Sequence, residues 1–216
     1  MLIAGVDEAG RGPCLGPMVL AVASIEKKEE DSLLEIGVKD SKLLSAKQRE
    51  EQFGKITKAV KEFSFTAISA EEIDSLRDRK SLNEIEAMRI GALLNGLKRK
   101  PEIVFIDSPD CISGNFAKRI KKFISFETML VAEHKADVNY PIVSAASIIA
   151  KVHRDDEIKK LEREFGRIGS GYPHDEDTIA FLKGFLKKNK SLPSFARKSW
   201  ITSQNMLEEQ FQKKLF

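Results

Sequence analysis

The most restrictive feature of this chain is the order in which apolar segments and helix-like segments follow one another. Two apolar segments, 1–6 and 17–25, flank a turn rich in glycine and proline near the amino terminus. Three further apolar segments, 63–68, 101–107 and 128–134, are separated by stretches whose apolar residues recur at helical spacing. A hairpin followed by alternating strands and helices predicts the α/β class, with a central mixed five-stranded sheet flanked by helices.

The predicted helices carry start and stop signals. Ser45, Ser69 and Ser81 are each followed three residues later by Gln or Glu, which is the pattern of a capping box. The longest helical pattern begins near residue 141 and ends at Gly166, a residue type common just past a helix end. These signals predict helices between the strands and after the last of them.

The chain of 216 residues is long enough for one large domain, and no linker or internal repeat divides it. Two further helical patterns, 175–188 and 203–214, follow the longest helix. We therefore expect residues 1–167 to form the main domain and residues 168–216 to form a helical extension packed on it.

Composition and charge narrow the class of protein. The hydrophobic fraction of 42% supports a substantial core, and the formal net charge of +3 allows a nucleic acid partner without requiring one. The amino terminus lacks the features of a signal peptide, and no apolar run approaches the roughly 20 residues that span a bilayer. Cys14 and Cys111, the two cysteines, have no metal-binding spacing. We expect a cytoplasmic protein that does not associate with membranes.

Acidic residues follow three of the predicted strands. Asp7 and Glu8 come directly after the first strand, Asp107 ends the fourth, and Asp137 lies a few residues beyond the end of the fifth. Ligands of open α/β sheets bind beyond the carboxyl ends of the strands, so these acids could converge there. Gathered carboxylates repel one another unless a cation neutralises them, and oxygen ligands favour Mg²⁺ or Mn²⁺. A single acid after a strand is also a common turn or cap residue, and the residues alone leave both interpretations open.

The glycine-rich turn, GVDEAGRGPCLGP, is compatible with more than one function. Its glycines nearly match the G-x-G-x-x-G fingerprint of a dinucleotide-binding enzyme, but Pro17 and an apolar strand follow where that fold needs a helix. Asp7 and Glu8 also precede the glycines, where they would repel a pyrophosphate. We exclude that class of enzyme. We also exclude a zinc site, because His134 and His153 have no partner at ligand spacing.

Six segments together resemble a known family. GVDEAGRGPCLGP is followed in order by KDSKLLS (39–45), FIDSPD (105–110), EHKAD (133–137), AASIIAKVHRD (145–155) and GSGYP (169–173). In order and spacing these segments are similar to those of type 2 ribonucleases H, and the chain resembles ribonuclease HII, most closely its archaeal form. The resemblance covers nearly the whole chain and weakens after about residue 204.

The resemblance implies a ribonuclease H-like fold, with residues 1–167 as the catalytic domain and a C-terminal helical extension. It implies a metal-dependent endoribonuclease that hydrolyses the RNA strand of RNA–DNA hybrids and cleaves 5′ of single ribonucleotides in DNA duplexes. The products would carry 3′-hydroxyl and 5′-phosphate ends. The family's catalytic and metal-binding carboxylates fall on Asp7, Glu8, Asp107 and Asp137. Two Mg²⁺ or Mn²⁺ ions would then activate a water and stabilise the departing oxygen.

The resemblance also implies how the substrate is recognised. In the family, a glycine–arginine–glycine loop and a tyrosine read the 2′-hydroxyl that distinguishes RNA from DNA. With a phosphate site ahead of a helix start, the candidates are Gly10, Arg11, Gly12, Ser41, Lys42 and Tyr172. Without the resemblance, Ser41 and Lys42 would be assigned to a solvated helix cap, and Tyr172 to loop packing.

Further basic residues have two interpretations each. Lys151 and Arg154 could face a phosphate, or they could form the charged face of the long helix. Arg197, Lys198 and Trp200 could contact the DNA strand, and Trp200 could instead pin the tail to the core.

The expected partners are RNA–DNA hybrid duplexes and DNA that contains ribonucleotides. Many archaeal members end in a glutamine–aliphatic–aromatic motif that binds the sliding clamp, but here the segment 204–211 has Gln210 where the first aromatic residue should be. We therefore expect a closing amphipathic helix without clamp binding, and a monomer. Two rival functions are disfavoured: a non-catalytic hybrid-binding module would lack an acid, and a DNA-junction nuclease would not need the loop and tyrosine.

Overall fold

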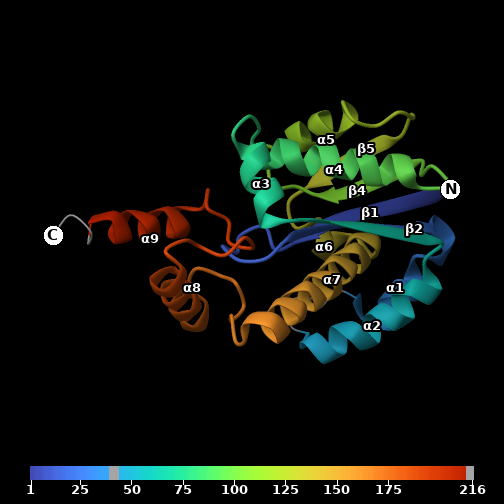
Figure 1. Ribbon diagram of the computed structural model, residues 1–216. Coiled ribbons are helices and arrows are strands. Elements are labelled where there is room, and N and C mark those ends of the chain that lie inside the picture. Colours follow the sequence, from blue (N-terminus) through green and yellow to red (C-terminus); the bar gives the residue numbers. More distant parts are fainter. Residues whose placement is uncertain (39–43, 213–216) are drawn as a thin grey trace. The chain divides into compact units, whose positions relative to one another are not determined.

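The computed structural model of the protein describes residues 1–38 and 44–212 (Figure 1). These residues form two compact units, each assembled from three segments of the chain. The segments of unit 1 begin at Met1, Val19 and Ser81, and those of unit 2 begin at Gly10, Ile68 and Arg154.

A mixed sheet of five strands forms the centre of unit 1. Its strands are β1 (Leu2–Ala9), β2 (Met18–Glu26), β3 (Glu62–Ile68), β4 (Ile103–Asp107) and β5 (Met129–Glu133). They lie in the order β3-β2-β1-β4-β5, with β1 antiparallel to β2, β1 parallel to β4, and β4 parallel to β5. The predicted α/β class with a mixed five-stranded sheet is therefore confirmed.

Helices cover both faces of this sheet. On one face lie α4 (Leu82–Gly96) and α5 (Ser113–Lys121), and on the other lie α1 (Asp31–Ile36), α2 (Ala46–Ala59) and the first part of α7 (Pro141–Phe165) (Figure 1). The 3-10 helix η1 (Lys27–Glu29) and the helix α6 (Ala136–Asn139) connect neighbouring elements. The sequence analysis missed α1 and α6, because helices this short give no clear apolar periodicity.

The helix signals in the sequence are confirmed. The hydroxyl groups of Ser45, Ser69 and Ser81 accept backbone N–H bonds at the starts of α2, α3 (Ala70–Arg77) and α4. Gly166 follows the last residue of α7 and has a φ of 79°. Because this left-handed conformation favours glycine, the residue ends the helix without backbone strain.

Strand β1 is longer than its apolar residues predict. The apolar segment ends at Val6, but the strand continues through Asp7 and Glu8 to Ala9, which pairs with Val19 of β2. The antiparallel partner bonds the backbone groups of these residues, so the strand continues although its side chains become acidic. Asp7 therefore stands inside the strand and is only 6% exposed.

The core of unit 1 packs α7 directly on β1. A Cβ on Gly5 would lie 2.4 Å from the carbonyl carbon and oxygen of Ile142. Buried side chains on both elements, including Ile3 and Val143, surround this contact. The helix therefore approaches the strand more closely than a side chain at position 5 would allow.

Unit 2 has an apolar core of its own. Its helices α8 (Glu176–Asn189) and α9 (Ile201–Gln212) contribute Leu186 and Met206, which pack in one cluster with Leu15. The predicted helices in this region are confirmed, and both begin within two residues of the expected positions.

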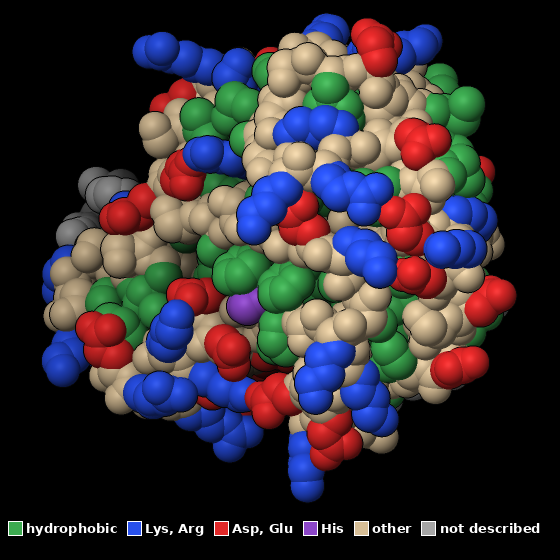
Figure 2. All heavy atoms as spheres, turned by 90° about the vertical axis from the view of Figure 1, so that its right-hand side faces the viewer, with side chains coloured by type: hydrophobic (Ala, Val, Ile, Leu, Met, Phe, Trp, Pro, Cys, Tyr) green, Lys and Arg blue, Asp and Glu red, His purple; other side chains and the backbone are tan. Residues whose placement is uncertain are grey.

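In the described part of the chain, no helix is both long and apolar enough to cross a membrane. On the face drawn in Figure 2, lysine and arginine side chains are interspersed with aspartate and glutamate side chains. This mixture agrees with the small net charge of +3. The described residues of this face therefore form no broad basic surface that would by itself indicate a nucleic acid partner.

We predict that Gly5→Ala destabilises the protein. The added Cβ would push α7 away from β1, and overpacking of this kind typically costs about 1–3 kcal/mol. Gly54→Ala in α2 is the matched control, because nothing lies within 4 Å of its added Cβ and alanine favours a helix. Chemical denaturation followed by circular dichroism should show a lower midpoint for Gly5→Ala alone. Equal midpoints for the two variants would contradict the packing argument.

Candidate active site

The four predicted carboxylates all belong to unit 1, and three of them stand on two neighbouring parallel strands. Val6 of β1 pairs with Ile106 of β4, so Asp7 and Asp107 occupy the next position on each strand. Side chains alternate along a strand, and matched positions of a parallel pair point to the same face. The register therefore places both carboxylates on one face near the carboxyl ends of β1 and β4.

Asp137 reaches the same end of the sheet through α6. Asp107 pairs with Glu133, the last residue of β5. Lys135, with a φ of 56°, then turns the chain into α6, and the N–H of Ala136 donates to Asp107 Oδ1 at 2.8 Å. The carboxylate of Asp107 therefore holds the residue next to Asp137.

Two serines on α7 hold two of the acids. The side chain of Ser147 hydrogen-bonds the carboxylate of Asp7, and the hydroxyl of Ser144 donates to the backbone carbonyl of Asp137. Both serines are buried. Sequence analysis missed this role, although their spacing of three residues places them on one face of a helix, which is a readable signal.

Asp7 lies in an environment that disfavours its charged form. Burial raises the pKa of this carboxyl well above its usual value of 3.8, and the charges of Glu8 and Asp107 raise it further. The bond from Ser147 and the bond from the N–H of Glu8, at 2.7 Å to Oδ1, act in the opposite direction. A cation beside these carboxylates would remove the repulsion that raises the pKa.

The acids have the donor chemistry of a site for a hard divalent cation. Carboxylate oxygens are the ligands that Mg²⁺ prefers, and gathered negative charges need a counter-ion. Among the described residues, no group of three or more His, Cys, Asp or Glu side chains has the arrangement of a metal site. The acids therefore fit a metal by chemistry and by their place at the strand ends, and their side chains would have to turn toward a bound ion.

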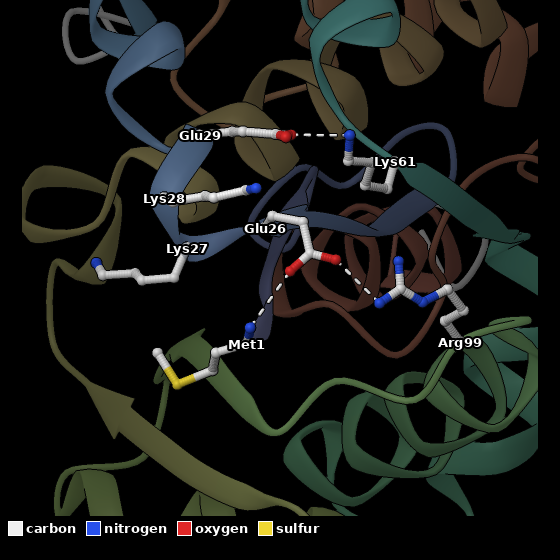
Figure 3. A pocket seen from close by; sticks show the side chains of 7 residues that line it. All are labelled: Met1, Glu26, Lys27, Lys28, Glu29, Lys61 and Arg99. Carbon is white, nitrogen blue, oxygen red and sulfur yellow. Dashed lines mark hydrogen bonds and ion pairs between the residues drawn. The ribbon is translucent and has the colours of Figure 1, made fainter.

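A depression of about 820 Å³ elsewhere in unit 1 is unrelated to these acids. It is lined by Met1, Glu26, Lys27, Lys28, Glu29, Lys61 and Arg99 (Figure 3). Met1 precedes β1 and Glu26 ends β2, so the depression lies at the other end of the hairpin from Asp7. The carboxylate of Glu26 pairs with the amino terminus at 3.4 Å and with Arg99 at 2.9 Å. Its acidic side chain is thus already engaged by cations of the same depression.

The glycine-rich loop and Tyr172 lie together in unit 2. The N–H of Cys14 donates to the carbonyl of Gly171 at 2.8 Å, which joins the two segments. A Cβ on Gly12 would lie 3.6 Å from Cε1 of Tyr172. The structure therefore brings together the loop and the tyrosine that the sequence analysis selected for substrate binding.

Arg154 is buried beside this loop, which corrects the interpretation of it as part of the charged face of the long helix. It is 7% exposed, its Nη2 donates to the carbonyl of Ser170 at 3.0 Å, and its guanidinium carbon lies 5.5 Å from the centre of the Tyr172 ring. Burial lowers the pKa of its guanidinium group. Gly10 has a φ of 80°, and a Cβ there would lie 2.3 Å from Arg154 Nε, so this position requires glycine.

Asp175 holds the segment that carries Tyr172. It caps α8, where its Oδ1 accepts the N–H of Asp177 at 3.0 Å, and its Oδ2 accepts the hydroxyl of Ser170 at 2.6 Å. Hydrogen bonds from Ser170 are the main cause that lowers the pKa of Asp175 to about 2. The charged carboxylate therefore ties the start of α8 to the loop beside Tyr172.

Arg197 does not extend toward a DNA strand, so for this residue that interpretation is wrong. It is fully buried, and Trp200 donates from Nε1 to the carbonyl of Gly12 at 3.1 Å. Both residues support the glycine-rich loop, which agrees with the alternative that Trp200 pins its segment in place. Burial, and then the nearby charge of Arg154, lowers the pKa of Arg197 to about 10, so its guanidinium group is charged at neutral pH.

Two of the remaining candidates, Ser41 and Lys42, lie outside the described residues. The ring nitrogens of His134 lie 3.2 Å and 3.3 Å from the carbonyl oxygens of Ser108 and Cys111. These contacts give this histidine a structural role, because they fix the chain that follows Asp107.

The chain is similar to known proteins over almost its whole length. A family model described as Ribonuclease HII matches residues 4–203. A Ribonuclease HII of Pyrococcus abyssi is 45% identical over 213 residues, which cover 99% of this chain and 94% of that protein. The crystal structure of the ribonuclease H2 from Pyrococcus horikoshii has a TM-score of 0.92 at 44% identity, covering 99% of this chain and 100% of that chain.

Two further solved structures are similar. The ribonuclease HII in a PCNA:RNase HII complex from Archaeoglobus fulgidus has a TM-score of 0.85 at 40% identity, covering 93% of this chain and 95% of that chain. Bst-RNase HIII in complex with Mn²⁺ has a TM-score of 0.81 at 20% identity, covering 98% of this chain and 71% of that chain. This last similarity is one of fold.

The mixed sheet, the acids at its strand ends and the similar structures define a protein with the ribonuclease H-like fold. Within that class, the chain belongs to the ribonuclease HII family. The family and fold expected from six segments of the sequence are therefore confirmed.

We predict that Asp7→Asn stabilises the metal-free protein at neutral pH. The pKa of Asp7 in the folded state lies above the usual 3.8, so between these two pKa values the folded state binds more protons than the unfolded state. The free energy of unfolding therefore falls as the pH rises through this range. The variant has no carboxyl at this position and does not lose this stability. In EDTA the variant should therefore melt at a higher temperature than the wild type.

The difference should vanish below pH 3.8, where the carboxyl is protonated in both states. Asp78→Asn, which changes an exposed aspartate, is the control variant. Scanning calorimetry across the pH range measures the effect. A variant that melts below the wild type at neutral pH would contradict the argument from buried charge.

Proposed function

We propose that this protein is an endoribonuclease that hydrolyses the RNA strand of RNA–DNA hybrids and cuts on the 5′ side of a single ribonucleotide in a DNA duplex. The products would be a 3′-hydroxyl and a 5′-phosphate. The observation that carries the proposal is the register that puts Asp7 and Asp107 on one face of neighbouring strands in a member of the ribonuclease HII family. No acid of the family's set is missing, which argues against a non-catalytic hybrid-binding module.

Asp7, Glu8, Asp107 and Asp137 would hold Mg²⁺ or Mn²⁺, with two ions per active site during cleavage. When bound, such ions lower the pKa of the attacking water and stabilise the departing 3′ oxygen. The chain's own groups hold the carboxylates, because Ser147 bonds Asp7 and a backbone N–H bonds Asp107. The Mn²⁺ in the structure of Bst-RNase HIII supports this choice of ion.

Gly10, Arg11, Gly12 and Tyr172 would recognise the ribonucleotide. With no side chain at Gly12, the loop backbone stays bare beside the tyrosine ring. A phenol can hydrogen-bond the 2′-hydroxyl of RNA, and its ring can stack on the neighbouring sugar. Only Ala9 separates the acidic pair from this loop in the sequence, so the proposed cutting and recognising groups are close neighbours along the chain.

Other expectations stay predictions. Ser41 and Lys42 would contact a phosphate, residues 1–167 would be the catalytic domain with residues 168–216 packed on it, and the protein would act as a monomer. The Archaeoglobus fulgidus ribonuclease HII forms a complex with PCNA. This chain has Gln210 in place of the first aromatic residue of the clamp motif, so we expect no clamp binding through the tail.

We predict metal-dependent cleavage of a DNA duplex that contains one ribonucleotide. With Mg²⁺ or Mn²⁺, an end-labelled strand should be cut once, on the 5′ side of the ribonucleotide, and denaturing electrophoresis would show the product. An all-DNA duplex of the same sequence is the control, and a long hybrid gives the relative activity. Asp107→Asn should lower turnover by about 10³-fold, the equivalent of several kcal/mol of lost charge stabilisation, without changing the fold. Equal cutting of the all-DNA duplex, or no cutting with either ion, would overturn the proposal.

We predict that Tyr172→Phe weakens the preference for the ribonucleotide and leaves the protein folded. The substitution removes one hydroxyl and keeps the ring, so the ratio of kcat/KM for the two duplexes should fall by about fivefold, as expected for one hydrogen bond. Tyr140→Phe changes the only other tyrosine and should keep the ratio. A Tyr172→Phe variant with full preference would remove this residue from the recognition site.

A further inference from the structure

The side chain of Arg197 is bonded to three carbonyl groups of the glycine-rich segment. Its Nη2 donates to the carbonyl of Gly10 at 2.6 Å, and its Nη1 donates to that of Arg11 at 2.9 Å. Its Nε and Nη2 also donate to the carbonyl of Gly16 at 3.2 Å and 3.1 Å. One fully buried guanidinium group thus connects both ends of the turn.

Trp200 binds the next carbonyl of the same loop. Its Nε1 donates to Gly12 at 3.1 Å. Two guanidinium groups lie near its ring, with the guanidinium carbon of Arg197 at 4.8 Å and that of Arg77 at 5.0 Å from the ring centre. The three successive carbonyls of the loop are therefore all bonded by Arg197 and Trp200.

Asp74 on α3 fixes the turn that carries these two residues. Its carboxylate accepts the backbone N–H groups of Lys198 at 2.7 Å and Ser199 at 3.0 Å, and the hydroxyl of Ser199 at 2.6 Å. A carboxylate that accepts three hydrogen bonds holds the local backbone in one conformation. The position of the loop therefore depends on α3 through the turn between α8 and α9.

These bonds decide which backbone groups the loop can offer a ligand. In a trans peptide the N–H points opposite to the carbonyl of the preceding residue. Because Arg197 bonds the carbonyls of Gly10 and Arg11, the N–H groups of Arg11 and Gly12 point away from it. Pro13 carries no N–H, so the peptide after Gly12 adds no donor. The loop therefore has two neighbouring donors on the side opposite the guanidinium group.

We propose that Arg197 is a positioning residue for ribonucleotide recognition, which holds the loop so that the N–H groups of Arg11 and Gly12 donate to the 2′-hydroxyl oxygen. Adjacent backbone N–H groups in one orientation form a ready site for an oxygen acceptor. The inference rests on the proposed function and adds to it a residue that never touches the nucleotide. Because Arg197 holds the loop by its carbonyl groups, the two N–H groups keep their orientation when no 2′-hydroxyl is bound.

A lysine cannot reproduce these contacts, which makes Arg197→Lys an informative variant. A guanidinium group has five donors in a rigid planar fork, whereas an ammonium group is a compact charge on a flexible stem. The substitution therefore keeps the positive charge and removes the geometry. An effect on recognition would come from the orientation of the loop and not from loss of charge.

The test compares Arg197→Lys with Arg167→Lys as the matched control. Arg167 belongs to the same unit, has an exposed side chain and pairs with Asp177. Fluorescence anisotropy in EDTA gives the Kd values for a duplex with one ribonucleotide and for an all-DNA duplex, and cleavage assays give kcat and KM separately. We expect Arg197→Lys to lower the ratio of the two affinities about tenfold and to raise KM, as for the loss of one well-placed hydrogen bond. Arg167→Lys should keep the wild-type ratio.

An unchanged affinity ratio in folded Arg197→Lys would overturn the proposal. If that variant does not fold, Asp74→Asn is the deciding variant, since it keeps Arg197 and weakens the turn that orients it, and an unchanged ratio there would overturn the proposal too. Amide exchange at Arg11 and Gly12 reports on the loop without substrate, and faster exchange in Arg197→Lys supports the positioning contact. A wild-type protein that neither cuts nor prefers the ribonucleotide would refute the proposed function, while the exchange measurement would still decide the contact.

Discussion

In unit 1, the backbone of α7 lies against the backbone of β1 at Gly5, where no side chain would fit. This close approach sets the position of the helix that carries Ser144 and Ser147. From there Ser147 bonds the carboxylate of Asp7, and Ser144 bonds the backbone of the short helix that carries Asp137. The same packing buries Asp7 and makes its negative charge unfavourable without a cation. A contact between two backbones thus sets both the positions of the supporting serines and the burial of Asp7.

The two units differ in how their buried charged side chains are compensated. In unit 1, burial and the neighbouring carboxylates raise the pKa of Asp7, and a cation beside the acids would balance their charges. In unit 2, Arg154 and Arg197 are buried and donate to backbone carbonyl oxygens. Buried charges are tolerated when hydrogen bonds replace the lost water, and a guanidinium group can bond several carbonyls at once. The first arrangement suits the binding of an ion, and the second gives a loop one fixed conformation.

Much of the fold could be predicted from the sequence, because the signals act over a few residues. The serine at 45 and the glycine at 166 mark helix ends through bonds to their own turn, and alternating or helical apolar spacing marks the elements between them. The end of β1 was placed too early, because the acidic residues hid a strand that its partner β2 continues. The short helices α1 and α6 were not predicted, because one or two helical turns contain too few apolar residues to show a periodicity.

By itself, the sequence determined the α/β class and the family, and it selected the four candidate carboxylates and the glycine-rich loop, because these depend on residue identity and on spacing along the chain. Only the tertiary structure decided which charged groups are buried and what they hold. Arginine side chains are usually exposed, so the sequence suggests surface positions for Arg154 and Arg197, but the structure places both in the interior of unit 2. Arg197 bonds a carbonyl that lies 187 positions earlier in the chain. No local pattern encodes such a contact, because burial and hydrogen bonding across this separation are decided by how the packed segments meet.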